Sequence, residues 1–323
     1  MLSTASSQAS KAAGYEPFAK GRFPVGVRTI EALDTARDRV FPCEVWSPEG
    51  AEGKHPLILY SHHSGGHRRA ATFLCDHLSS HGYVVAALDH SEVVAAELKG
   101  REGETAEQLS ARVDAWIANR VPDIRFLLDH LLSGTEVRAD PDRVGIVGHS
   151  FGGWTALAAP EVESRIRAVV ALAPAGSSQP KPGIIPAKLT FRWDRNIPTL
   201  YLVAENDVPL PLDGMYEIFE RTPSAKQMVI LRQADHYHFL DNVEDVHETV
   251  RATTFPEFLA WMTAEMRPIS ELCSGEQAHL LVRGLTVCHM DAALKEHPEA
   301  RQFLGGDIEA ELAARGVDVL VHK

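Results

Sequence analysis

The most constraining feature of this sequence is a Gly-x-Ser-x-Gly pattern over Gly148–Gly152, between a β-branched run and a stretch of small residues. The run Val144–Val147 predicts a buried strand, and the residues after Gly152 predict a helix. A turn that joins the two so sharply leaves no room for side chains beside the serine, which accounts for both glycines. This strand-turn-helix raises Ser150 above the sheet and is typical of a nucleophile elbow.

Apolar strands and helical segments alternate on both sides of this turn. The pattern is typical of an α/β fold with a mostly parallel central sheet and helices on both faces. We predict extended segments at 25–30 and 40–46, buried strands at 57–60, 83–88, 144–147, 168–172, 199–203 and 227–231, helices at 71–81, 106–132 and 212–220, and helical structure over 276–323.

The chain of 323 residues has one type of composition and no internal repeat, so we expect a single domain over 23–323. Residues 1–22 are small and polar, which predicts a flexible N-terminal arm. Two longer segments near 91–119 and 177–197 interrupt the alternation after strands, where open α/β sheets form ligand crevices. We expect these two segments to be cap-like insertions that wall a pocket, with surface decoration as the alternative.

Charge and cysteine usage restrict the partners and the location. The net charge of −12 argues against nucleic acid as a partner. The four cysteines form no C-x-x-C pair and are expected to be reduced thiols. The first residues lack the pattern of a signal peptide, and no apolar run is long enough for a transmembrane segment. We therefore expect a cytoplasmic protein, and the sequence leaves its oligomeric state open.

A serine becomes a strong nucleophile only when a base removes its proton, and a carboxylate must orient that base. In folds with this elbow the acid and then the base follow the serine along the chain. Asp207 lies in the turn after a predicted strand, with Glu205 as the alternative. His236 opens the loop after the next strand, with His238 as the alternative. We predict that Ser150, Asp207 and His236 form a catalytic triad.

The tetrahedral intermediate of such a reaction needs backbone N–H donors for its oxyanion. Phe151, directly after the serine, supplies one, and the glycine-containing loop after strand 57–60 should supply the other. His62, His63 and His67 cluster in that loop, but no carboxylate lies nearby at ligand spacing. We therefore expect no metal site and no cofactor, and the role of the cluster stays open. The residues expected to line the substrate pocket are His63, Trp154, Trp116 and Phe191.

Segments spread over roughly residues 21–305 carry a family resemblance. They are 21–28, 45–48, 59–66, 88–91, 119–125, 148–153, 207 and 233–236. These segments resemble the α/β-hydrolases of the dienelactone-hydrolase-like group, which includes the platelet-activating-factor acetylhydrolases. The resemblance implies the α/β-hydrolase fold, the same triad residues, and Ser64 as the second oxyanion donor.

The chain departs from that family at three points. The family usually has His-Gly before the oxyanion residue, whereas this chain has His62-His63. True dienelactone hydrolases use a cysteine nucleophile, whereas this chain has Ser150. In the acetylhydrolases the acid follows the strand after the elbow helix, but here that strand leads into 172–176 without a carboxylate. The acid must then come one strand later, which again favours Asp207.

These features predict a serine hydrolase that cleaves carboxylic esters through an acyl-enzyme. The expected partner is a small-molecule ester, and lipid-like esters are among the candidates. Amide or thioester hydrolysis and acyl transfer by the same triad are alternatives, because the pocket chooses the leaving group. A binding protein on a hydrolase fold without turnover is the alternative from another class.

Overall fold

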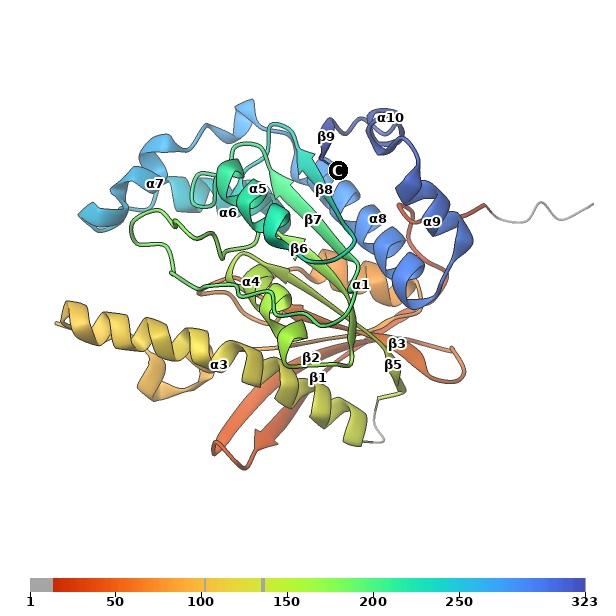
Figure 1. The fold of residues 1–323 in the computed structure, drawn as a ribbon, viewed down its shortest axis with the longest axis horizontal. Helices are drawn as coiled ribbons and strands as arrows, with labels where there is room; N and C mark the ends of the chain where they lie inside the picture. Colours follow the sequence, from red (N-terminus) through yellow and green to blue (C-terminus); the bar gives the residue numbers. More distant parts are fainter. Residues whose placement is uncertain (1–13, 102, 135–136, 323) are drawn as a thin grey trace, which may run out of the picture.

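The computed structural model describes residues 14–101, 103–134 and 137–322. Its centre is one mixed β-sheet (Figure 1). The strands in the described residues are β1 (Val25–Asp34), β2 (Arg39–Pro48), β3 (His55–Ser61), β4 (Val84–Leu88), β5 (Ala139–His149), β6 (Ile166–Leu172), β7 (Thr199–Ala204), β8 (Lys226–Leu231) and β9 (Val319–His322). Their order across the sheet is β1-β2-β4-β3-β5-β6-β7-β8-β9.

Most neighbouring strands of this sheet run parallel. The strands from β4 to β8 in the sheet order pair in parallel, whereas β1 and β2 at one edge and β9 at the other join antiparallel. Parallel neighbours need a connection that crosses a face of the sheet, so such sheets are covered on both sides. The mostly parallel sheet expected from the sequence is confirmed.

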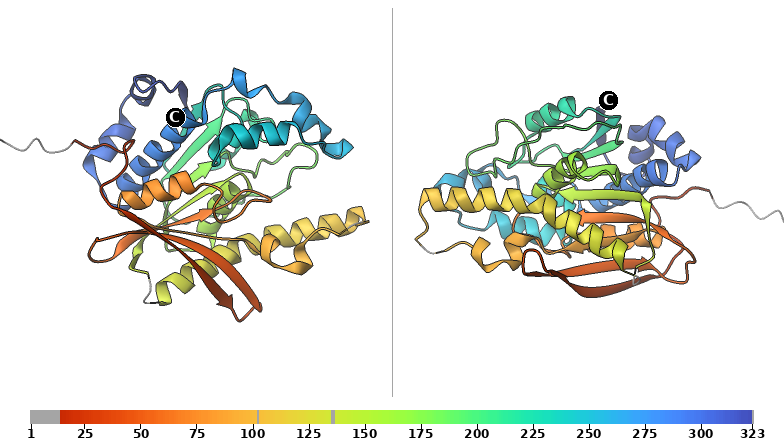
Figure 2. Two further views of the ribbon diagram at one scale, coloured as in Figure 1. Left: turned by 180° about the vertical axis from the view of Figure 1, so that it is seen from behind. Right: turned by 60° about the horizontal axis from the view of Figure 1, so that its bottom comes forward.

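Helices cover both faces of the sheet (Figure 1, Figure 2). The α-helices in the described residues are α1 (Thr72–Ser80), α2 (Ser91–Val94), α3 (Ala106–Ser133), α4 (Phe151–Ala158), α5 (Leu212–Arg221), α6 (Val243–Arg251), α7 (Ala260–Glu265), α8 (Gly275–Leu294), α9 (Pro298–Gly305) and α10 (Ile308–Ala313). Side chains alternate along each strand. Leu57 and Leu59 of β3 share a core with α3, α4 and α5, and Ile58 and Tyr60 share the other core with α1, α8 and α10.

The two expected insertions follow β4 and β6, at the carboxyl edge of the parallel strands. The first contains α2, a 3-10 turn at Ala96–Leu98 and the first half of α3. The second, 177–197, is fully described and contains neither helix nor strand. The first half of α3, the 177–197 segment and α7 project at the same end of the molecule (Figure 1, Figure 2). No helix in the described ranges combines the length and apolar character that crossing a membrane requires.

The expected N-terminal arm is described only from residue 14, so its first 13 residues lie outside the described part. The described part of the arm packs on the domain. The Tyr15 hydroxyl donates to Asp291 at 3.0 Å. Phe18 lies so close to α8 that a Cβ on Gly284 would come within 2.0 Å of its ring. Residues 14–22 therefore lie against the domain, as a draped arm would, and the flexibility expected of the whole arm stays a prediction.

The C-terminal end also differs from the helical structure expected over 276–323. Residues Val319–His322 form β9, which pairs antiparallel with β8. Val319 is buried in the core that contains α8, whereas Leu320 is 43% exposed. The strand forms because the open edge of β8 offers unpaired N–H and C=O groups, and a helical pattern cannot reveal such a partner.

We predict that Phe18→Ala lowers the free energy of unfolding by roughly 1–3 kcal/mol, because the ring loses its contact with α8. Urea denaturation of both proteins measures this difference. Glu16→Ala is the control, since Glu16 is exposed on the same segment. Equal stability of Phe18→Ala and wild type would mean that the arm contributes nothing to the folded domain.

Candidate active site

Ser150 lies in a strained turn between β5 and α4. Its φ of 59° with ψ of −117° is a conformation that non-glycine residues rarely adopt. A Cβ on Gly148 would lie 2.0 Å from the carbonyl oxygen of Gly152, and a Cβ on Gly152 would lie 2.0 Å from that of Ser61. Backbone contacts therefore require both glycines of the pattern. The turn leaves Ser150 partly exposed at the N-terminal end of α4.

A chain of hydrogen bonds joins this serine to the predicted base and acid. The Ser150 Oγ lies 2.9 Å from His236 Nε2, and His236 Nδ1 lies 2.7 Å from Asp207 Oδ2. The other carboxylate oxygen of Asp207 accepts the Leu210 N–H at 2.7 Å. An ionised carboxylate only accepts hydrogen bonds, so His236 Nδ1 carries the proton and Nε2 is free to accept from the serine hydroxyl.

Burial shapes the electrostatics of this chain. The side chains of Asp207 and His236 are 1% and 9% exposed. Burial raises the pKa of the Asp207 carboxyl, and His236 and the Leu210 N–H oppose this rise. The carboxylate is thus screened little by water and interacts strongly with the imidazole.

The two alternatives named from the sequence have other partners. Glu205 accepts the N–H of Gln233 at 3.0 Å and pairs with Arg232 at 3.5 Å. His238 is fully buried and contacts Asp235 at 2.8 Å through Nδ1. Its Nε2 lies 3.0 Å from a backbone carbonyl of the segment before α8. Of the two candidate pairs, Asp207 and His236 are the ones brought to Ser150.

Two further imidazoles surround His236. The ring of His149, the residue before the serine, is fully buried and centred 4.7 Å from that of His236. The centre of the His63 ring lies 5.6 Å from the centre of the His149 ring. Burial, followed by the proximity of His236, lowers the pKa of His149 well below its usual range and that of His63 to about 3. Both are therefore neutral near pH 7, and they surround His236 with uncharged aromatic surface.

The loop histidines do not converge on a common point. His62 Nδ1 lies 2.7 Å from the carbonyl of His63, whose own ring packs toward His149. His67 is exposed, and its Nδ1 accepts the N–H of Arg69 at 3.1 Å. The cluster seen in the sequence therefore separates into three residues with different contacts.

The two predicted oxyanion donors lie on segments that touch. Phe151 is the first residue of α4, where N–H groups have no partner within the helix. Ser64 is exposed in the loop after β3. A Cβ on Gly152 would lie 2.0 Å from the Ser61 carbonyl and 2.7 Å from that of His62, so the loop rests directly on the first turn of α4.

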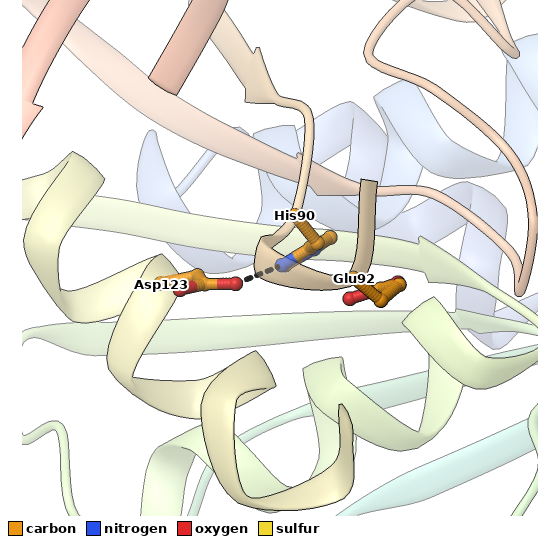
Figure 3. A group of neighbouring side chains, drawn as sticks. All are labelled: His90, Glu92 and Asp123. Atoms are coloured by element: carbon orange, nitrogen blue, oxygen red, sulfur yellow. Dashed lines mark hydrogen bonds and ion pairs between the residues drawn. The ribbon is translucent and has the colours of Figure 1, made fainter. Parts of the chain in front are cut away.

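A second Ser–His–Asp arrangement is buried beneath that loop. Ser61 Oγ lies 2.8 Å from His90 Nε2. On the other side of the ring, His90 Nδ1 lies 3.1 Å from Asp123 Oδ2 (Figure 3). All three residues are completely buried. Burial, then Arg120 and Arg37, lowers the pKa of His90 well below its usual range, so this imidazole is neutral.

His90, Glu92 and Asp123 are also the one group of possible metal ligands that converges within the described residues (Figure 3). Their charges are already matched by cations. Arg120 pairs with Glu92, and Arg37 pairs with Asp123 at 2.6 Å. A divalent ion here would face two guanidinium groups, so the donor set fits an ion-pair network better than a metal site.

A cavity of about 320 Å³ lies between the loops that follow β6 and β7. Gly176, Ile184 and Leu210 are among its lining residues. Its walls connect to the site, because Leu210 bonds Asp207 and the residue before Gly176 bonds the Ser150 carbonyl. Part of the 177–197 segment therefore lines this cavity, whose lining residues include none of the three triad residues.

The four residues predicted to line the substrate pocket do not line this cavity. His63 lies beside the triad histidine, as described above. Trp154 and Phe191 are only 5% and 9% exposed and belong to the core. Trp116 is half-buried and donates its indole N–H to the Leu98 carbonyl at 2.8 Å. Aromatic side chains bury as readily in a core as in a pocket, and the sequence pattern does not separate the two.

Arg120 is not among the site residues predicted from the sequence, although it lies in the 119–125 segment that carries the family resemblance. Arg120 is completely buried in α3 and contacts the loop after β3. Its spacing of three residues from Asp123 on one helix was the available signal, since such residues lie on one face. The partners that make this arginine significant come from distant segments.

Comparisons with known proteins identify relatives of this chain. Cutinase est1 of Thermobifida alba is 24% identical over 218 residues, which cover 67% of this chain and 64% of the cutinase. The platelet-activating factor acetylhydrolase of Cavia porcellus is 25% identical over 243 residues, which cover 62% of this chain and 51% of that protein. The chain thus spans about two thirds and about half of the length of these two relatives.

A ferulic acid esterase from Streptomyces cinnamoneus has the same fold, with a TM-score of 0.64 at 23% identity over 88% of this chain and 95% of that one. The α/β-hydrolase fold expected from the sequence is confirmed. Residues 14–200 match the family profile described as Chlorophyllase, a range that includes Ser150 and ends before Asp207 and His236. This range is more than half of the chain, and the chain belongs to the chlorophyllase family.

Proposed function

We propose that this protein hydrolyses carboxylic esters, with Ser150 as nucleophile, His236 as general base and acid, and Asp207 as the residue that orients the imidazole. The observation that carries the proposal is the pair of hydrogen bonds, 2.9 Å and 2.7 Å long, that joins the three side chains. The relatives named above are a cutinase, an acetylhydrolase and a ferulic acid esterase, and these names favour an ester as the substrate.

The first half of the reaction forms an acyl-enzyme. Ser150 Oγ attacks the ester carbonyl carbon while His236 Nε2 takes the hydroxyl proton, and the carbonyl electron pair moves onto the oxygen. Asp207 stabilises the imidazolium that forms. When the intermediate collapses, the alcohol leaves with the proton from His236, and the acyl group stays on the serine.

Water completes the reaction in the second half. His236 removes a proton from water, the hydroxide attacks the acyl carbon, and collapse releases the carboxylic acid and restores the Ser150 hydroxyl. In both halves the oxyanion accepts hydrogen bonds from the N–H groups of Phe151 and Ser64. The cavity that Ile184 and Leu210 line is suited to an apolar part of a small ester, and the Leu210 N–H links its wall to Asp207.

We predict that Ser150→Ala and His236→Gln each lower kcat for a p-nitrophenyl ester by ~10⁴–10⁶. Asp207→Asn should lose ~10²–10⁴, because the imidazole loses its orientation. Glu205→Gln is the matched control for the acid and should keep wild-type kcat, since Glu205 contacts Arg232 and the Gln233 N–H. Circular dichroism checks that each variant is folded. A larger loss in Glu205→Gln than in Asp207→Asn would transfer the role of the acid.

Labelling with a fluorophosphonate probe distinguishes an enzyme from a binding protein on the same fold. We expect the wild type to react covalently at Ser150 and the Ser150→Ala variant to remain unlabelled, as mass spectrometry of the intact chains measures. An unlabelled wild type that also hydrolyses no ester would refute the proposed function.

His238 has a different role in this proposal, because it anchors the loop that carries His236. Asp235 accepts hydrogen bonds from His238 at 2.8 Å and lies 2.6 Å from His247 of α6. Burial is the largest single influence and lowers the pKa of His238, but the hydrogen bonds and charges of Asp235 and Cys273 together outweigh it and raise the pKa to about 10. The imidazolium is therefore part of the folded state at neutral pH.

We predict that this anchor makes stability depend on pH. The pKa of His238 is higher in the folded protein than in the unfolded chain, where it is about 6.5. Its contribution is complete below that value and is lost as pH rises toward 10, at no more than about 1.4 kcal/mol per pH unit. Urea unfolding between pH 7 and pH 10 should show this decline in wild type and a flatter profile in His238→Gln. Parallel profiles for the two proteins would contradict it.

A further inference from the structure

The buried guanidinium of Arg120 touches both segments that carry the proposed oxyanion donors. Its Nη1 donates to the His62 carbonyl at 2.6 Å, and its Nη2 donates to the His63 carbonyl at 3.3 Å. Its central carbon lies 4.2 Å from the centre of the Phe151 ring. Arg120 is completely buried, so these contacts exchange little with water.

The contact with His63 has a consequence for the next residue. The carbonyl of His63 and the N–H of Ser64 belong to one planar trans peptide and point in opposite directions. Because Arg120 holds the carbonyl end, the Ser64 N–H must point away from the guanidinium. The His62 Nδ1–H donates to the same carbonyl at 2.7 Å and the Gly66 N–H at 3.1 Å, so three donors fix the orientation of this peptide, and Arg120 is the charged one.

The cation also acts on the strength of that donor. A positive charge at the carbonyl end of a peptide polarises it, which makes the N–H at the other end a better donor. On the second segment, the flat guanidinium stacks on the Phe151 ring and restrains the first residue of α4. One side chain thus restrains both peptides that would face the oxyanion.

A set of buried partners fixes Arg120 itself. Its Nη2 pairs with Glu92 of α2, which is nearly buried. Its Nη1 also lies 3.4 Å from Ser61 Oγ, whose hydroxyl bonds the neutral His90. His90 in turn bonds Asp123 on the same helix as Arg120. The buried Ser61, His90 and Asp123 therefore hold Arg120 in position, and we assign them no catalytic role.

We propose that Arg120 is the positioning residue of the oxyanion hole: it orients the Ser64 N–H through the His63 carbonyl and restrains Phe151 by stacking. This inference rests on the function proposed above. Arg120 would then contribute to transition-state stabilisation without touching the substrate.

Kinetics of Arg120→Met test the proposal. We expect kcat for a p-nitrophenyl ester to fall by ~10–10³, the range for a lost or misdirected oxyanion donor, while KM changes little. The serine Oγ adds to the carbonyl carbon of a trifluoromethyl ketone and forms a tetrahedral adduct with an oxyanion. The inhibition constant of this ketone should rise by the same factor by which kcat/KM falls. The methyl ketone of the same shape, which mimics the unreacted ester, should keep its affinity.

Arg195→Met is the matched control. Arg195 also donates to backbone carbonyls, those of Pro160, Glu163 and Ile166. Ile166 begins β6, so this contact lies at the amino ends of the parallel strands, away from the loops that follow their carboxyl ends. We expect this variant to lose thermal stability while it retains kcat and the affinity for the trifluoromethyl ketone. If Arg195→Met shows the same kinetic losses as Arg120→Met, the effect is one of general stability and the proposal is wrong.

Arg120→Lys keeps the test informative if Arg120→Met does not fold. A lysine keeps the charge but cannot donate to both carbonyls and to Glu92 in one plane, so we expect a smaller loss of kcat and an equally smaller rise in the ketone inhibition constant. Wild-type kcat and ketone affinity in a folded Arg120 variant would overturn the inference and leave the proposed function intact. Failure of the wild type to hydrolyse esters or react with the fluorophosphonate would instead overturn the proposed function.

Discussion

Direct contact between two backbone segments determines the geometry of this site. The carbonyls of Ser61 and His62 lie against Gly152, where a Cβ would come within 2.0 Å and 2.7 Å of their oxygens. On its other side, the His62 carbonyl accepts a hydrogen bond from Arg120. The loop after β3 is thus packed between the first turn of α4 and the buried Arg120 side chain. These contacts fix its position relative to the sheet.

The rest of the fold keeps these segments in place. Strands β3 and β5 are neighbours in the sheet, so the loop and the elbow leave the same edge side by side. The helices that cover the two faces arise from strict alternation along fully buried strands. Burying Arg120, Glu92 and Asp123 in this scaffold carries a desolvation cost, which the ion pairs Arg120–Glu92 and Arg37–Asp123 offset. Removal of one partner would leave a buried charge without its counter-ion, and this favours the one arrangement in which every charge is paired.

The sequence predicted the parts of the fold whose signals are local. Strands β3 to β8 are buried on both faces and therefore appear as short apolar runs. Ser150, Asp207 and His236 each follow one of these parallel strands, so their loops meet at the carboxyl ends of the strands. The β9 strand could not be predicted in this way, because its four residues depend on the open edge of β8. Arg120 was missed for a related reason: its partners His62, His63 and Glu92 lie 28 or more residues away.

The two Ser–His–Asp arrangements show why hydrogen-bond geometry alone does not define an active site. Ser61 and Ser150 lie 2.8 Å and 2.9 Å from their histidines, yet Ser61 is completely buried and Ser150 is partly exposed on a strained turn. The electrostatics differ as well. A base must become an imidazolium, and Arg120 and Arg37 disfavour a positive charge on His90. Beside Ser150, the buried carboxylate of Asp207 lies 2.7 Å from His236 and can stabilise the imidazolium that forms during the reaction. Arg120, which together with burial disfavours an imidazolium at His90, is thus also the residue that holds the loop beside Ser150.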